Sequence, residues 1–251
     1  MAGLTLGLLL LVRWFCAPRK ATLALLAGYL LLALALAWTF LPCFSLSNAV
    51  LCRGPSNQKW IALTLDDGPN EPFTSQVLDI LKQRQVHATF FLVGREIVRS
   101  PKTVERMLRE GHAISNHTET HRPLVWRSRS AIQEELTAWE AAIAPLHPTG
   151  TKLFRSPHGW KDPWLPGLLK QRDYRWIGWT LGVWDSDRPG VELLNARLRE
   201  LPNGSILLLH DGDGDHPDAD RSQTVAVLPK LIDDKLSQGF QFVTIPEMFN
   251  F

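Results

Sequence analysis

The stretch Trp60-Ile-Ala-Leu-Thr-Leu-Asp-Asp-Gly-Pro69 decides the fold that we expect for this chain. An apolar run closed by a Gly-Pro pair predicts a buried strand that stops where the two acids begin. Asp66 and Asp67 would then lie at the carboxyl end of a strand, where open α/β sheets and (β/α) barrels place their active sites. A turn at Gly68 can aim both carboxylates into one cleft.

Two adjacent carboxylates repel each other, and burying them unpaired costs free energy. A bound cation, or a division of roles between a metal ligand and a base, would remove that cost. The alternative is a surface turn, because Asp-Asp-Gly is common in loops. The rest of the chain favours a site at Asp66 and Asp67 over a surface turn.

Strand-like and helix-like stretches alternate from Trp60 to the end of the chain. We predict strands at residues 60–65, 87–93, 111–116, 153–154, 176–181, 205–209 and 240–245. We predict helices at residues 73–84, 101–110, 130–144, 191–201 and 224–236. A repeated strand-then-helix order predicts a parallel sheet with right-handed crossovers. We therefore expect an α/β fold, a distorted (β/α) barrel of about seven parallel strands with one working face.

The first 50 residues differ from the rest, because they carry Arg13, Arg19 and Lys20 but no acidic residue. Residues 21–42 are almost wholly apolar, and crossing a bilayer core takes roughly 20 such residues. We predict an N-terminal transmembrane helical segment here, within a membrane anchor of residues 1–50. Because basic residues precede the span, the positive-inside rule places residues 51–251, the predicted catalytic domain, on the extracytoplasmic side of the cytoplasmic membrane.

The segment Met1–Val12 is also apolar and is either a short first span or a membrane-lying segment. The anchor is thus single-pass or a hairpin, and the side of the domain is the same in both cases. A cleaved signal peptide is the competing interpretation, but no clean small-x-small site follows the apolar run, so we favour an uncleaved anchor. Cys43 and Cys52 flank the membrane exit, and a disulfide and two free thiols are equally compatible with the sequence.

Composition narrows the class of protein. Outside the anchor, basic and acidic residues nearly balance, which argues against nucleic acid as a partner. No cysteine lies beyond Cys52, so this part of the chain has neither a thiolate nucleophile nor a cysteine metal site. The sequence does not indicate an oligomeric state.

The stretch His117-Thr-Glu-Thr-His121 places two imidazoles four residues apart, just past the third predicted strand. On one turn of helix this spacing brings both rings to the same face, where they can bind one divalent ion. Such pairs also occur on solvated helices. Asp67 supplies a hard third ligand, and three protein ligands leave coordination open, as in catalytic sites. Two imidazoles and one carboxylate suit Zn²⁺, and Co²⁺ or Ni²⁺ almost as well.

Taken together, Thr64-Leu-Asp-Asp-Gly-Pro69 and His117–His121 resemble the first two motifs of the polysaccharide deacetylases, carbohydrate esterase family 4. This family includes chitin, chitooligosaccharide and peptidoglycan deacetylases. The third and fifth motifs resemble Phe154-Arg-Ser-Pro-His-Gly159 and Ile206-Leu-Leu-Leu-His-Asp211. The resemblance covers most of the chain beyond the anchor, with the motifs in the family's order.

The resemblance implies a role for each matching residue. Asp66 matches the catalytic base, which activates the attacking water. The metal ligands of the family match Asp67, His117 and His121. Arg155 matches the arginine that orients the base.

His210 matches the general acid that protonates the leaving amine. Amide hydrolysis needs a polarised carbonyl, a deprotonated water and a proton for the nitrogen, so a metal, Asp66 and His210 would provide one each. The oxyanion donor of the family is a backbone N–H, which falls at His158, directly after Pro157. A tyrosine or similar residue is more usual there, but a backbone N–H needs no particular side chain.

The fourth motif departs most from the family pattern. The chain reads Trp179-Thr-Leu-Gly-Val-Trp-Asp-Ser186. Of the two acidic residues in the family pattern it retains only one, Asp185, which could tune Arg155 or His210. Ser186 replaces a tryptophan that walls the acetyl pocket in the family. We expect Trp184 or Trp179 to take over that wall.

The stretch Asp211-Gly-Asp-Gly-Asp215 imitates the start of a calcium-binding loop. However, its sixth position is His216 rather than glycine, and its twelfth is Ser222 rather than glutamate. We therefore predict an elongated loop at the rim of the cleft.

The sequence thus predicts a metal-dependent hydrolase that removes N-acetyl groups from N-acetylglucosamine-type glycans outside the cytoplasmic membrane. The glycan is chitooligosaccharide, peptidoglycan or an exopolysaccharide. A first alternative is a deformylase or deacetylase of a lipid-linked amino sugar, which suits the anchor and the altered fourth motif. A second is a non-catalytic glycan-binding protein on the same fold, which predicts the loss of a ligand or an acid-base residue, and the sequence retains them all.

Overall fold

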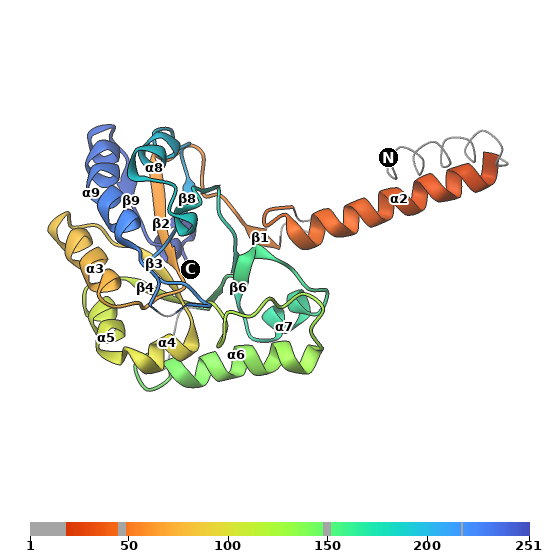
Figure 1. Ribbon diagram of the computed structural model, residues 1–251, viewed down its shortest axis with the longest axis horizontal. Helices are drawn as coiled ribbons and strands as arrows, with labels where there is room; N and C mark the ends of the chain where they lie inside the picture. Colours follow the sequence, from red (N-terminus) through yellow and green to blue (C-terminus); the bar gives the residue numbers. More distant parts are fainter. Residues whose placement is uncertain (1–18, 45–48, 148–151, 217) are drawn as a thin grey trace, which may run out of the picture.

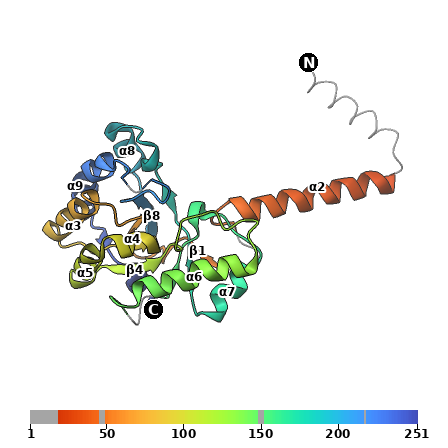
Figure 2. The same cartoon turned by 60° about the horizontal axis from the view of Figure 1, so that its bottom comes forward.

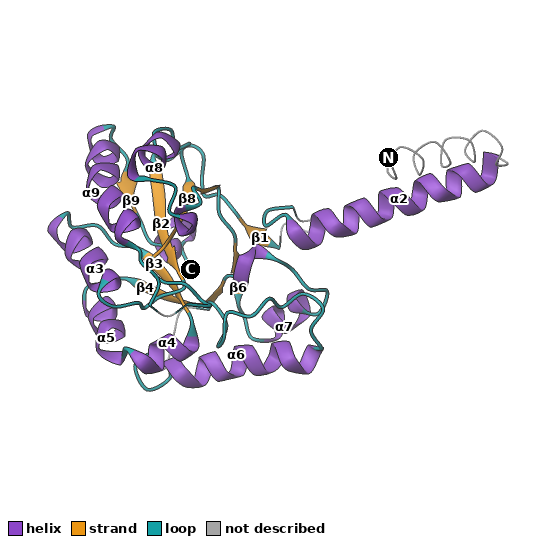
Figure 3. Cartoon of the chain, in the orientation of Figure 1, coloured by secondary structure: helices purple, strands orange, loops and turns teal. Residues whose placement is uncertain are grey.

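The computed structural model describes residues 19–44, 49–147, 152–216 and 218–251. The predicted membrane segment Met1–Val12 lies outside the described residues. Figure 1 shows two parts: a long helix, α2 (Arg19–Phe40), that projects from one side, and an α/β domain. In Figure 3 the strands form the centre of the domain and the helices surround them.

One sheet of parallel strands forms the centre of the domain. It contains nine strands among the described residues, in the order β1-β6-β5-β4-β3-β2-β8-β7, with β9 beside β2. Their bounds are β1 (Val50–Leu51), β2 (Trp60–Asp66), β3 (Thr89–Leu92), β4 (Ala113–Asn116), β5 (Leu153–Phe154), β6 (Arg175–Ile177), β7 (Leu181–Gly182), β8 (Ser205–His210) and β9 (Gln241–Phe242). Every ladder between these strands is parallel, which confirms the prediction. The end strands β1 and β7 form no ladder with each other in the described part, so the sheet is a curled, incomplete barrel.

The helices of the domain lie around the outside of this sheet (Figure 2). They are α3 (Phe73–Gln83), α4 (Gly94–Arg99), α5 (Pro101–Arg109), α6 (Arg129–Ile143), α7 (Leu165–Gln171), α8 (Val191–Arg197), α9 (Ser222–Ser237) and α10 (Ile245–Phe249). Two short 3₁₀ helices, η1 (Pro157–Gly159) and η2 (Asp185–Asp187), follow β5 and β7. We did not predict α4, α7 and α10, because such short helices carry too few turns to show an apolar period.

The strand predicted at residues 176–181 is divided. Its first half is β6, which pairs with β5 and β1, and its second half is β7, which pairs with β8. Between them, the Gly178 N–H donates to the Leu51 carbonyl at 2.8 Å, and the Thr180 N–H donates to the Ile206 carbonyl at 2.8 Å. The chain thus leaves one edge of the curled sheet and joins the other within one apolar run.

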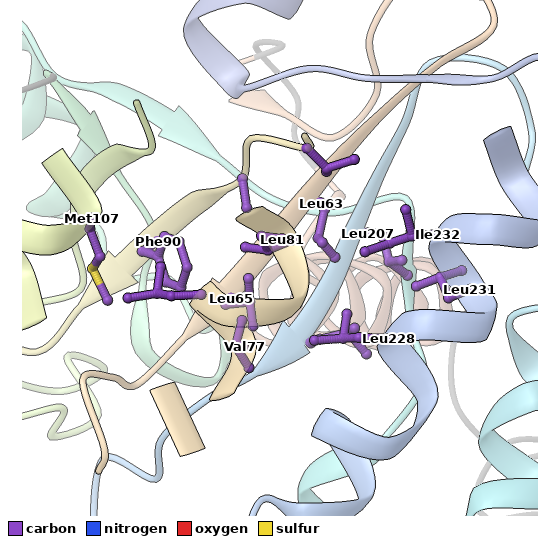
Figure 4. Packing of buried hydrophobic residues seen from close by; sticks show 14 of the residues in the cluster. Leu63, Leu65, Val77, Leu81, Phe90, Met107, Leu207, Leu228, Leu231 and Ile232 are labelled. Atoms are coloured by element: carbon purple, nitrogen blue, oxygen red, sulfur yellow. The ribbon is translucent and has the colours of Figure 1, made fainter. Parts of the chain in front are cut away.

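The main core lies between the sheet and helices α3 and α9 (Figure 4). Leu63 and Leu65 of β2 and Leu207 of β8 are fully buried there. The residues of β2 from 61 to 66 are buried on both faces, as in a parallel sheet covered on both sides. Burying each leucine stabilises the fold by roughly 2 kcal/mol, so β2 is held firmly where it delivers Asp66.

Residues 23–36 of helix α2 are exposed, and residues 21–40 are long and apolar enough to cross a membrane. Directly after it, Cys43 and Cys52 form a disulfide with their Cα atoms 5.9 Å apart, which decides between the two states that the sequence left open. The sheet then begins at Val50, which pairs with Trp176. The predicted boundary between anchor and catalytic domain, at residues 50 and 51, is therefore crossed by the disulfide and lies within strand β1.

Candidate active site

Two neighbouring strands bring Asp66 and His210 to the same level. In the parallel ladder of β2 and β8, these two residues are register partners. Aligned residues of neighbouring strands point to the same face of a sheet. A carboxylate and an imidazole therefore lie side by side, and both line a cavity of about 200 Å³.

A turn of the backbone at Asp67 brings the second carboxylate to this cavity. Asp67 has a φ of 74°, in the left-handed region that residues other than glycine rarely adopt. Our prediction that Gly68 makes the turn was wrong, because the positive φ is at Asp67 itself. Such strain costs about 1–3 kcal/mol and clusters at functional sites.

His117 and His121 follow β4 in a loop, so the helical turn that we predicted for them is not formed. The Asn116 side chain accepts the Thr118 N–H at 2.8 Å, and the Thr118 hydroxyl accepts the His121 N–H at 3.1 Å. Such local bonds compete with helix formation. Thr118 and His121 also have positive φ values of 67° and 60°. The loop still brings the two imidazoles together, with ring centroids 5.0 Å apart.

Asp67, His117 and His121 form a group that could hold one metal ion. Asp67 Oδ1 lies 3.2 Å from His117 Nε2 and 3.1 Å from His121 Nε2. This oxygen is buried and forms no hydrogen bond within the part of the chain that the structure describes.

The tautomer of His117 shows that these three residues fit a cation. Its Nδ1 lies 2.8 Å from the Arg155 backbone carbonyl, which can only accept, so Nδ1 carries a proton. Nε2 is then the nitrogen that faces the Asp67 carboxylate. A histidine whose other nitrogen is held by a carbonyl is the usual arrangement of a metal ligand.

The charge state of Asp67 agrees with this fit. Burial opposes its charge, but His121 and His117 outweigh burial and hold the pKa of Asp67 well below its usual value. Burial also opposes the charge of His121, and Asp67 raises the pKa of that imidazole above its usual value. The group is thus built to keep a negative carboxylate facing two imidazoles.

Arg155 holds the other carboxylate in place. The guanidinium is fully buried and donates to Asp66 Oδ1 at 2.6 Å, to Thr64 Oγ1 at 2.8 Å and to the Gly178 carbonyl at 2.9 Å. A charge-assisted bond of this length fixes the orientation of the Asp66 carboxylate. Our sequence reasoning missed Thr64, although a Thr two residues before Asp66 on a strand must share its face.

Asp185 fixes the position of His210 through two hydrogen bonds. Its two carboxylate oxygens accept from the backbone N–H of His210 at 2.8 Å and from Nδ1 at 2.9 Å. Thr224, which sequence reasoning also missed, donates its hydroxyl to Asp185 at 2.8 Å. Burial lowers the pKa of His210, but the charge and hydrogen bond of Asp185 outweigh burial and raise it to about 9. With Nδ1 engaged, Nε2 is the nitrogen left for the cavity.

Comparison with known proteins agrees with this geometry. A family model described as polysaccharide deacetylase matches residues 53–177. A peptidoglycan-N-acetylglucosamine deacetylase of Bacillus cereus is 36% identical over 208 residues, covering 78% of this chain and 91% of that protein. The chain belongs to the polysaccharide deacetylase family. The resemblance on which our sequence analysis relied is thereby confirmed.

Two further relatives of this polysaccharide deacetylase support the assignment. A chitooligosaccharide deacetylase of Sinorhizobium fredii is 35% identical over 195 residues, covering 74% of this chain and 90% of that protein. The crystal structure of a peptidoglycan N-acetylglucosamine deacetylase in complex with a hydroxamate-bearing ligand matches with a TM-score of 0.75 at 30% identity. That match covers 80% of this chain and 93% of the solved chain, so the deacetylase fold is confirmed.

The residues around the opening of the cavity, its rim, differ more from our expectations than the buried residues at its floor. His158 lines the cavity with a φ of 56°, and its backbone N–H bonds to no described residue. Pro157 is buried beside it and does not line the cavity. Of the two tryptophans expected at the acyl wall, Trp179 lines the cavity, whereas Trp184 is 68% exposed and does not.

Ser186 and Arg221 also line the cavity of this deacetylase. Arg221 is buried and donates to the carbonyls of Gly212 at 2.6 Å and Ser186 at 3.2 Å, and to the Asp213 carboxylate at 3.0 Å. Asp213 and Asp215 line the same opening, so the loop predicted at the rim does lie there. Sequence reasoning missed Arg221, because two of its three partners are backbone carbonyls, which no motif shows.

Proposed function

We propose that this polysaccharide deacetylase is a metal-dependent hydrolase that removes N-acetyl groups from N-acetylglucosamine-type glycans outside the cytoplasmic membrane. One observation carries the proposal: a cavity with a carboxylate and an imidazole on neighbouring strands, beside three convergent side chains that could hold a metal ion. The substrate class is supported by the two curated relatives, which are named for peptidoglycan and chitooligosaccharide.

Asp67, His117 and His121 would hold the ion, which is most simply Zn²⁺, with Co²⁺ or Ni²⁺ also suited to two imidazoles and a carboxylate. A divalent ion bound there supplies Lewis acidity, polarising the amide carbonyl and lowering the pKa of water. The oxygen of Asp67 without a hydrogen bond and the tautomer of His117 support this assignment.

The remaining residues handle protons and charge. Asp66 takes the proton of the attacking water, in the orientation that Arg155 fixes. On the neighbouring strand, His210 gives a proton to the leaving amine, and Asp185 keeps that imidazole protonated and correctly turned. The backbone N–H of His158, which bonds to no residue that the structure describes, donates to the developing oxyanion.

The exposed helix α2 supports an uncleaved anchor with the domain outside the membrane. The basic residues Arg19 and Lys20 precede the span, which by the positive-inside rule keeps that end in the cytoplasm.

The test uses the full-length protein in lipid nanodiscs, loaded in turn with Zn²⁺, Co²⁺ and Ni²⁺. Release of acetate and of formate is measured from chitooligosaccharide, peptidoglycan and a lipid-linked amino sugar, with Asp66→Asn as the matched control. We expect metal-dependent acetate release that the control lacks. Formate from the lipid-linked sugar alone would favour the deformylase alternative. Glycan binding without any hydrolysis would favour the non-catalytic one.

A further inference from the structure

We propose that the catalytic domain itself contacts the bilayer, through a surface that adjoins the end of α2. We call this surface the juxtamembrane face and define it by Phe40, Trp126, Trp164, Arg122 and Arg127. The inference rests on the proposed anchoring by α2 and adds a second contact between the protein and the membrane. The contact would hold the cavity at the bilayer surface, where the available substrates are membrane-attached glycan chains.

Lys161 fixes the end of α2 on the domain. Its backbone N–H donates to the Thr39 carbonyl at 2.9 Å. Its ammonium is buried and donates to the carbonyls of Leu41 and, at 3.0 Å, Pro42. Carbonyls at and just beyond a helix C-terminus lack partners within the helix and carry its partial negative charge, so a lysine there is favourable. The span therefore leaves the domain in a defined direction.

Aromatic contacts also connect the end of α2 to the loops of the domain. Phe40, the last residue of α2, packs edge-on against Trp160 at 5.4 Å and Trp126 at 6.2 Å between ring centroids. Asp162 accepts the backbone N–H groups of both Trp126 at 3.2 Å and Trp164 at 2.9 Å, which ties the two indole-bearing loops together. Trp126 is 84% exposed and Trp164 is 53% exposed.

The length of α2 sets the depth at which these indoles lie. Residues 21–40 rise about 30 Å as a helix, which matches the hydrocarbon core of a bilayer. Phe40 then lies at the boundary of the core, and Trp126 beside it lies in the headgroup layer, where indoles are favoured. Helix α7, which begins directly after Trp164, lies on the side of the domain from which α2 leaves (Figures 1 and 2). Large exposed indoles at this place thus have a lipid environment to enter.

The charges of the same loop suit anionic lipids. Arg122, Arg127 and Arg129 flank Trp126 and are exposed. None of the three pairs with a carboxylate in the described part of the chain; Arg127 reaches the Pro123 carbonyl and Arg129 the Gln171 amide oxygen. Apolar rings combined with basic side chains bind the interface of anionic bilayers.

The juxtamembrane face and the cavity share a wall. Trp160, which packs on Phe40, also contacts the His158 ring in a tilted arrangement, with centroids 5.0 Å apart, and His158 lines the cavity. At Gly159 an added Cβ would come within 2.7 Å of Pro42 and 2.5 Å of Trp179, so the segment after α2 lies directly behind the acyl wall. A domain lying on the bilayer in this way keeps the cavity close to the lipid surface.

The first experiment measures depth without using catalysis. Full-length protein carrying 5-fluorotryptophan is placed in anionic nanodiscs with or without paramagnetic headgroup lipids, and each ¹⁹F resonance is assigned by Trp→Phe substitution. We expect the resonances of Trp126 and Trp164 to broaden several-fold more than that of Trp184. Trp184 is the matched control, because it is also well exposed but precedes η2, on the segment that leads to α8. Equal broadening of all three would overturn the proposal.

The second experiment tests the consequence for substrates. Turnover is compared between a membrane-attached glycan in the same nanodisc and a soluble chitooligosaccharide, for wild type and a Trp126→Ser, Trp164→Ser variant. We expect a several-fold lower rate on the membrane-attached glycan alone, and no change with Val98→Ser, another exposed apolar residue, on α4. An unchanged ratio of the two rates contradicts the proposal. If wild type hydrolyses neither glycan, the proposed function fails, and the ¹⁹F measurement alone decides on the face.

Discussion

The floor and the rim of the cavity are built in different ways. The floor consists of buried side chains that follow central strands and lie against one another: Asp66, Asp67, His117, His121 and Arg155. The rim consists of less buried residues in loops and in η2: Trp179, Ser186, Asp213 and Asp215. The difference teaches that the chemistry is fixed by mutual contacts, whereas the shape of the opening depends on loops that can change.

The largest effect is expected at the floor, from Asp66→Asn. An amide cannot take the proton of water, so turnover should fall by about 10³-fold or more. The metal ligands are untouched, so one equivalent of metal should remain by mass spectrometry. Turnover within a few fold of wild type would mean that another residue is the base.

The next effect is expected from losing a metal ligand. A chelator should abolish acetate release by wild type, and Zn²⁺, Co²⁺ or Ni²⁺ should restore it. His121→Ala should bind the metal at least about 10-fold more weakly, and saturating metal should restore its activity only in part. A chelated wild-type protein that still works at its full rate would refute metal dependence.

A smaller effect, with a signature in pH, is expected at the boundary between floor and rim. Asp185→Asn removes the charge that keeps the pKa of His210 at about 9, so that pKa should fall. Protonated His210 is the form that donates, so the alkaline limb of the kcat/KM profile should move to lower pH. Turnover at neutral pH should drop by about 10- to 100-fold. An unmoved alkaline limb would assign it to another group.

The smallest effect is expected at the rim. Ser186→Trp should fill part of the cavity beside Trp179. Acetyl turnover should change by only a few fold, while the preference for acetyl over propionyl substrates should rise by roughly 10-fold, as for one methylene in a tight pocket. Loss of all activity would show that rim and floor are not independent.

The sequence predicted the floor well because its signals are local. The run that ends at Asp66 and Asp67 marked a buried strand, and the parallel sheet followed from the alternation of elements. The backbone turn at Asp67 was not predictable, because residues other than glycine rarely adopt a positive φ. The loop of His117 and His121 was not predicted either, because it depends on side-chain bonds of Asn116 and Thr118 that compete with a helical turn.

Other features depend on contacts between distant parts of the chain. Lys161 bonds to carbonyls about 120 residues earlier, and no local pattern indicates a lysine at the end of another helix. The division of the strand at residues 176–181 likewise depends on which sheet edge each half meets. At the acyl wall, the choice of Trp179 over Trp184 was undecided for the same reason.

Because Asp66 and His210 are register partners on β2 and β8, catalysis depends on the register of these two strands. If β8 slid by a single residue against β2, every side chain of β8 would change faces. Leu209 would then enter the pocket, and the imidazole would turn into the hydrophobic layer. One deletion between Ser205 and Leu209 would therefore abolish activity, although every residue named in the site would still be present in the chain.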